Sequence, residues 1–294
     1  MAVTKFNQKH KGILLILSAA FCFACMNACV RMSGEIPTVQ KSFFRNAVAL
    51  LVAVVALARE GKGFRPASKK NWFLLLCRAS FGTVGILANF YAVDHLLLSD
   101  ASMLNKMSPF FAVIASIFLL KERLSSVQIL SLVGAFTGAL MVIKPSFTNM
   151  ALGASLVGLL GGIAAGIAYT IVRMLGQRGE RSSFIVFFFS GFSCLIVLPS
   201  ILLNYTPMTL QQTLWLLGAG LCAAGGQFSI TGAYRCAPAR EISVYDYSQV
   251  IFAAALGFFL FGDRPDLLSI LGYIIICSMA VMNFLHNNKK SHHT

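Results

Sequence analysis

The sequence predicts an all-α polytopic membrane protein with ten transmembrane helices, arranged as two inverted five-helix repeats. Three observations support this fold class. Of the 294 residues, 57% are hydrophobic and only 12% are charged, whereas a typical soluble domain has about 25% charged residues. Apolar runs long enough to cross a bilayer follow one another along the whole chain. Segments of the first half recur about 141 residues later in the second half.

A transmembrane helix needs about 20 mostly apolar residues. Ten segments come close to this requirement: 12–33, 40–58, 71–94, 99–120, 126–143, 150–173, 183–203, 211–235, 241–261 and 266–286. The second segment is short, and the junction between the eighth and ninth is weakly marked. The first apolar run exceeds the 7–15 residues of a signal-peptide core, so we interpret it as a retained first span.

The internal repeat is clearest where "FAVIASIFLLKER" (111–123) aligns with "FAAALGFFLFGDR" (252–264). Because each repeat has five spans, an odd number, the second repeat must be inverted in the membrane. We expect four parts: a cytoplasmic tail 1–11, a first repeat 12–144, a second repeat 150–286 and a cytoplasmic tail 287–294. Inverted repeats are typical of secondary transporters, which bind their substrate near the midplane between the halves.

The positive charges indicate the orientation. The N-terminal tail and five segments hold sixteen of the 24 Lys and Arg residues: 59–70, 121–123, 173–181, 262–266 and 286–294. The connecting segments on the opposite side of the membrane hold five Lys and Arg residues, and Arg235 is one of them. By the positive-inside bias, both termini are cytoplasmic, and we expect a multi-pass protein of a prokaryotic inner (plasma) membrane. The basic residues form short clusters instead of one stripe or tail, so the net charge of +14 does not indicate nucleic-acid binding.

The fourth span contains a charge and a helix breaker, Lys106 and Pro109. Ser102, Asn105, Lys106 and Pro109 have the spacing i, i+3, i+4, i+7, which places them on one side of a helix. Pro109 cannot donate a hydrogen bond to the carbonyl of Asn105. Free backbone groups at membrane depth are tolerated only against protein or water. This face should therefore point inward, with Pro109 in a gating or structural role.

A shift of 141 residues places Ser243, Asp246 and Tyr247 opposite this face, with Tyr245 and Gln249 nearby. Asp246 should lie at the depth of Lys106. An unpaired charge at mid-helix costs about 2.5–3.5 kcal/mol on the insertion scale. Two readings stay open: a structural ion pair that joins the halves, or direct contact with substrate or a proton. A gating pair would combine them.

Other polar residues lie within predicted spans. The uncharged ones are Asn27, Asn89, Tyr169 and Gln227. A neighbouring helix could satisfy each one, but together with the fourth and ninth spans they suggest a mixed polar and aromatic chamber. Arg45 and Arg78 lie near the ends of their spans. Snorkelling to the interface is at least as good an interpretation as cavity lining for Arg45, and it is the default for Arg78.

Motifs of catalysis and of metal binding are missing from the sequence. Cys22, Cys25 and Cys29 share a helical face, but no second cysteine pair or nearby histidine completes a metal site. We therefore predict no metal and no cofactor. The chain has no GxSxG, HExxH or phosphate-binding GxxxxGK[ST] motif, and its histidines lie at helix ends or tails. These features predict that the chain is neither an enzyme nor an ATP-driven pump on its own.

On the segments "SPFFAVIASIFLLKERLSSVQILSLVGAFTGALMVI" and "SQVIFAAALGFFLFGDRPDLLSILGYIIICSMAVM", the chain resembles EamA-type members of the drug/metabolite transporter superfamily, over about residues 12–286. The resemblance implies alternating access through a cavity lined by helices one, three, four, six, eight and nine. Glu122 and Asp263 match the acids that close helices four and nine at the cytoplasmic turn, where a structural role is expected. The proline of helix four is present as Pro109, but its counterpart in helix nine is Val250.

The deep charges are two or three cations against one anion, which favours an anionic or zwitterionic metabolite such as an amino acid or a nucleotide-like compound. The alternative is an exporter of cationic or amphipathic compounds, with Asp246 as counter-ion and Tyr245, Tyr247 and Tyr169 as an aromatic cage. A coupling proton at Asp246 is a further hypothesis. The expected partners are the lipid bilayer and a small-molecule substrate, and the sequence assigns no oligomeric state.

Overall fold

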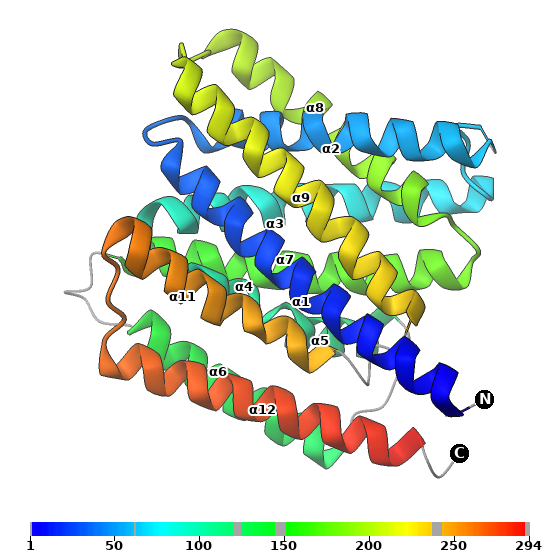
Figure 1. The fold of residues 1–294 in the computed structure, drawn as a ribbon, viewed down its shortest axis with the longest axis vertical. Coiled ribbons are helices and arrows are strands. Elements are labelled where there is room, and N and C mark those ends of the chain that lie inside the picture. Colours follow the sequence, from blue (N-terminus) through cyan, green and yellow to red (C-terminus); the bar gives the residue numbers. More distant parts are fainter. Residues whose placement is uncertain (1, 62, 120–124, 145–150, 237–242, 292–294) are drawn as a thin grey trace.

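The computed structural model describes residues 2–61, 63–119, 125–144, 151–236 and 243–291, and every regular element in these ranges is a helix (Figure 1). The first half contains α1 (Ala2–Met32), α2 (Thr38–Glu60), the short η1 (Lys69–Asn71), α3 (Trp72–His95), α4 (Leu98–Asn105), α5 (Ser108–Leu119) and α6 (Ser126–Ile143). The second half contains α7 (Leu152–Gln177), α8 (Ser182–Leu203), α9 (Leu210–Cys236), η2 (Ser243–Tyr247), α11 (Ser248–Phe261) and α12 (Leu267–Ser291). Eight helices in the described ranges are long and apolar enough to span a membrane. The pairs α4–α5 and η2–α11 supply the other two spans.

The fourth span is not the single helix predicted for residues 99–120. It breaks between α4 and α5, where the amide of Lys106 donates to the carbonyl of Ser102 and the amide of Phe110 donates to the carbonyl of Met107. Pro109 explains the break, because it has no N–H and disfavours helical geometry in the residue before it. The ninth span is also divided, at the junction of η2 and α11. The second break forms without a proline, since Val250 stands at the equivalent position.

The two halves pack with internal symmetry. α1 lies along α9, and α3 lies along α7. Exchange of the halves converts the first pair into the second, because α1 corresponds to α7 and α9 to α3. α2 packs on α8 and α6 on α12, each with its own counterpart (Figure 1). This arrangement confirms the two five-helix repeats.

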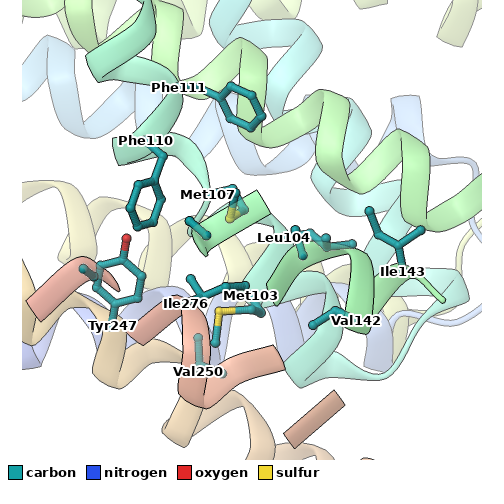
Figure 2. Close-up of a cluster of buried hydrophobic side chains, with 13 residues drawn as sticks. Met103, Leu104, Met107, Phe110, Phe111, Val142, Ile143, Tyr247, Val250 and Ile276 are labelled. Carbon is teal, nitrogen blue, oxygen red and sulfur yellow. The ribbon is translucent and has the colours of Figure 1, made fainter. Parts of the chain in front are cut away.

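Glycines let α7 approach the break closely. A Cβ atom at Gly162 would lie 2.6 Å from the carbonyl oxygen of Leu104, and one at Gly166 would lie 2.6 Å from that of Ser108. Small residues allow helix backbones in a membrane to come this close. Beside the break, Met103, Phe110 and Tyr247 belong to an apolar cluster with residues of α6 and α12 (Figure 2). The α6–α12 pair therefore covers one flank of both broken spans.

Both termini lie at the same end of the molecule (Figure 1), which we call the terminal side. The turns 33–37, 96–97 and 262–266 lie at the opposite end, the far side, where Asp263 contacts Arg31 and the amide of Leu98. The predicted position of Asp263 on the cytoplasmic turn with Glu122 is therefore wrong, since inverted repeats place equivalent residues on opposite sides. Glu122 itself lies outside the described residues.

The far-side position of residues 262–266 changes the distribution of positive charge between the two sides. Arg264 lies in the far-side turn and leaves the set of sixteen, whereas Arg235, counted for the opposite side, lies in the last turn of α9 at the terminal side (Figure 1). The excess of positive charge near the termini is unchanged by this exchange.

Candidate functional site

A cavity of about 110 Å³ lies between the two halves. Eight of the polar residues singled out from the sequence line it: Asn27, Asn89, Asn105, Lys106, Tyr169, Gln227, Asp246 and Gln249. They come from α1, α3, the α4–α5 break, α7, α9 and the η2–α11 region, which are the six spans that the family resemblance implies. Arg45 on α2 and Phe189 on α8 add two further walls.

Lys106 and Asp246 form an ion pair between the halves, with 2.5 Å between Nζ and Oδ2. Their side chains are only 8% and 16% exposed. Each residue lies at the break of its span, where the backbone turns away from a straight helix. The second carboxylate oxygen of Asp246, Oδ1, is buried and accepts no hydrogen bond from the described residues. The pair therefore joins the halves and still has one acceptor free within the cavity wall.

An amide pair lies on the first and third helices. The Asn89 side-chain amide donates to Oδ1 of Asn27 at 3.2 Å, and both residues are buried. Oδ1 of Asn89 has no donor within the part of the chain that the structure describes. These two side chains thus offer a polar wall with an unused acceptor.

The sequence left Arg45 open between snorkelling and cavity lining, and it misplaced Arg78. Snorkelling was the default for Arg78 and an equal choice for Arg45, but both line the cavity and are only 8% and 4% exposed, respectively. Nη1 of Arg45 donates to Oδ1 of Asn46 at 2.7 Å. Neither arginine has a carboxylate partner among the described residues, and Nε of both is buried without an acceptor there. The two positive charges also repel each other.

A glycine makes room for the Arg78 guanidinium. A Cβ atom at Gly82, one turn further along α3, would lie 2.1 Å from Nη1 of Arg78 and 2.7 Å from the Phe189 ring. The guanidinium carbon lies 4.0 Å from the centre of that ring, a cation–π contact. Gly82 and Phe189 were both missed, and the only sequence signal was the i, i+4 spacing of Arg78 and Gly82.

Several predicted residues lie elsewhere. Tyr245 is 40% exposed and lines a separate recess with Tyr247, whose side chain lies in the apolar cluster of Figure 2. The aromatic cage expected from these two residues and Tyr169 is therefore not assembled. The Pro109 side chain is exposed, so its effect is on the backbone. Asp246 and Tyr247 lie in the 3-10 helix η2, where neighbours differ by about 120° in direction, which explains why Asp246 faces the cavity and Tyr247 does not.

Charged side chains on the far side form ion pairs that connect the helices there. Asp263 accepts hydrogen bonds from Nη1 and Nη2 of Arg31 at 2.5 and 3.0 Å, and from the Leu98 amide at 3.0 Å. This carboxylate connects the α11–α12 turn to α1 and to the start of α4. In α2, Lys41 pairs with Asp94 of α3 at 2.6 Å. The hydrogen bonds of Asp263 are those expected of a structural residue.

The electrostatics of the cavity are positive. Its described lining contains the cations Arg45, Arg78 and Lys106 and the single carboxylate Asp246. Interactions between charges are stronger in such a buried site than in water. A guanidinium offers a fork of N–H donors that fits a carboxylate or a phosphate. The site can therefore bind an anionic group.

Comparisons with known proteins agree with this architecture. The EamA-like transporter family matches residues 10–144 and 152–285. The pseudopaline exporter CntI of Pseudomonas aeruginosa is 32% identical, over 90% of this chain and 93% of its own length. A riboflavin transporter of Vibrio cholerae is 26% identical, over 96% and 95%. Solute carrier family 35 member G1 of Homo sapiens is 25% identical, over 92% and 78%.

A crystal structure of 13% sequence identity shares the fold, with a TM-score of 0.66 over 95% of this chain and 98% of the other. The family and the named relatives are transporters, so the protein is a multi-pass membrane transporter of a small molecule. The chain belongs to the EamA-like transporter family, of the drug/metabolite transporter type.

Proposed function

We propose that the protein is a secondary transporter that moves an anionic or zwitterionic organic metabolite, such as an amino acid or a nucleotide-like compound, through the central cavity by alternating access. One observation carries this proposal: Arg45 and Arg78 are buried in the cavity wall without a carboxylate partner among the described residues. A buried charge without a partner is costly. A carboxylate or phosphate of the substrate would relieve this cost.

The zwitterionic case uses the other side of the cavity. Oδ1 of Asp246 is free to accept a hydrogen bond from a substrate ammonium group, while the arginines hold its anionic group. The names of the relatives, a pseudopaline exporter and a riboflavin transporter, support a small organic metabolite as substrate but do not indicate its charge. Bacterial relatives favour the inner membrane, and the positive charges near the termini favour a cytoplasmic terminal side.

The two broken spans support alternating access. The α4–α5 break and the η2–α11 break meet at the Lys106–Asp246 pair, where the halves are joined by one ion pair at the cavity. Substrate that competes for either partner would loosen this joint. Asp246 also offers a site for a coupling proton. Asp246→Asn should then abolish transport driven by a pH gradient, and unchanged transport would contradict proton coupling.

The alternative function is export of cationic or amphipathic compounds with Asp246 as counter-ion. In this alternative Asp246 still lies in the cavity, but no aromatic cage surrounds the cation, because Tyr245 and Tyr247 lie outside the cavity. In addition, Lys106 occupies one oxygen of Asp246. The geometry therefore supports the anionic reading better.

A thermal-shift panel on the purified protein tests the proposal, since a ligand that binds only the folded state raises its Tm. Dicarboxylates, amino acids, nucleotides and quaternary ammonium compounds are compared at equal ionic strength. The panel is repeated on Arg45→Gln and Arg78→Gln, with the exposed Arg59→Gln in α2 as matched control. We expect anions to stabilise the parent and Arg59→Gln, but neither cavity variant.

Equal stabilisation of all four proteins by anions would contradict the proposal. Stabilisation by cations alone, lost in Asp246→Asn, would establish the alternative. Counterflow of each hit in proteoliposomes then distinguishes transport from binding.

A further inference from the structure

A second cavity of about 190 Å³ lies beside the central one, between α2, α8 and α9. The two cavities share one lining residue, Gln227. Seven apolar side chains make up most of the second cavity wall: Ala49, Val52, Ala53, Ala56, Val186, Ala224 and Phe228. The polar lining residues are Glu60, Ser182, Ser183 and Gln227. No Lys or Arg side chain lines it in the described part of the chain. Its chemistry is therefore opposite to that of the positively charged central cavity.

The two cavities also share helix faces. On α2, Arg45 lines the central cavity and Ala49, one turn further, lines the second. On α8, Phe189 lines the central cavity and Val186 lines the second. Residues three or four positions apart lie on the same side of a helix. A molecule lying along these faces would thus meet the Arg45 guanidinium at one end and alanine methyl groups at the other.

The second cavity has a closed end and an open end. Ala49, Ala53 and Ala224 are 3%, 3% and 7% exposed and form the closed part. Glu60 and Ser182 are exposed and lie at the terminal-side ends of α2 and α8. An apolar cavity of about 150 Å³ is large enough to bind benzene. The space beside Ala53 can therefore hold an aromatic ring or a short alkyl chain.

We infer that the substrate is an amphipathic organic anion, whose charged group lies between Arg45 and Arg78 and whose apolar portion occupies the cavity beside Ala49 and Ala53. This inference rests on the proposed function and narrows it to a substrate class. Small hydrophilic anions would leave the second cavity empty. Each methylene buried there should raise affinity about fourfold, the factor that corresponds to about 0.8 kcal/mol.

The test measures the affinities of n-alkyl carboxylates from acetate to hexanoate, and of phenylacetate, for the full chain in lipid nanodiscs. The matching primary amides supply the same tails with a neutral head group. Affinity for the carboxylates should rise about fourfold per methylene until the cavity is full. Ala53→Phe, which fills the cavity, should weaken hexanoate at least tenfold and leave acetate unchanged. Ala58→Phe, at an exposed position of α2 outside both cavities, is the matched control.

Ala224→Leu fills the same cavity from α9 and serves if Ala53→Phe does not fold. If the carboxylates bind with affinities independent of tail length, or if tail dependence persists in both filled variants, the inference is wrong and the anion transporter proposal stands. If amides bind as tightly as carboxylates, the second cavity holds a neutral apolar molecule such as a lipid chain, which also overturns the inference. If no carboxylate binds the parent protein, this inference fails, and the proposed function fails as well only if the nucleotides of the thermal-shift panel also do not bind.

Discussion

Two buried cations lie one turn apart on α2 and have opposite surroundings. Lys41 is fully buried, and its ammonium group lies 2.6 Å from Oδ1 of Asp94. Arg45 is 4% exposed and donates to Asn46, with no carboxylate partner in the described ranges. The same contrast separates Arg31 and Lys144 on the far side, which are paired with Asp263 and Asp266, from the arginines of the central cavity.

This difference assigns different tasks to similar residues. A paired buried charge holds the fold together, because removal of one partner leaves the other uncompensated. An unpaired buried charge in a cavity wall contributes little to the stability of the fold and is available to a ligand. Folding and binding should therefore respond in opposite ways to substitution of Lys41 and Arg45.

The largest expected effect is on folding. Lys41→Met should lower the free energy of unfolding by about 3–5 kcal/mol, because Asp94 is left in a mostly buried site without its counter-ion. Titration with SDS in mixed micelles measures this quantity. The double variant Lys41→Met/Asp94→Asn should recover much of the loss. A loss below about 1 kcal/mol in the single variant would show that the pair behaves like an exposed one.

The second effect is on binding. Arg45→Met should leave the ligand-free protein as stable as the parent or more so, because an uncompensated charge is removed. It should weaken an anionic ligand about tenfold to a hundredfold, since hydrogen bonds to charged groups contribute about 1.5–3 kcal/mol. Unfolding without ligand and ligand titration measure the two parts separately. Destabilisation like that of Lys41→Met would remove the contrast between the two sites.

A third, smaller effect should follow from the space that Gly82 leaves for the Arg78 guanidinium. Gly82→Ala places a methyl group against the guanidinium and the Phe189 ring, and overpacking costs about 1–3 kcal/mol. Displacement of Arg78 should also weaken anion binding. Gly153→Ala is the control, since a Cβ there meets nothing within 4 Å; it should be neutral or stabilise α7 by up to about 1 kcal/mol. Unchanged stability and binding in Gly82→Ala would show that Arg78 does not need the space left by Gly82.

The smallest effect concerns an exposed pair on the far side. The hydrogen bond from Lys144 lowers the pKa of Asp266 from its ordinary 3.8 to about 2. Because the pKa is lower in the folded state, the pair stabilises the protein above about pH 4 and loses this contribution as the pH falls toward 2. Lys144→Gln should lower Tm slightly at pH 6 and much less at pH 2.5. Both groups are partly exposed, so the effect should stay below about 1 kcal/mol.

Much of the candidate site could be predicted because the 141-residue repeat relates Lys106 to the Asp246–Tyr247 region. That relation placed the two charges at one depth, and the structure joins them at 2.5 Å. It did not decide which of Asp246 and Tyr247 faces inward. The direction of the Arg45 and Arg78 side chains was harder to predict. The distance of a residue from a helix end does not show whether its side chain points to lipid headgroups or toward α7 and α8.

The sequence by itself determined the membrane class, the ten spans and the repeat, because lipid restricts the length and composition of every crossing segment. The sequence also placed a helix breaker, Pro109, in the fourth span, although a single helix was predicted there. The tertiary structure alone decided the rotation of each helix about its axis and the break before Ser248. These features depend on contacts between the halves, such as α3 with α7 and α1 with α9. Such contacts join residues far apart in the chain, and no local pattern records them.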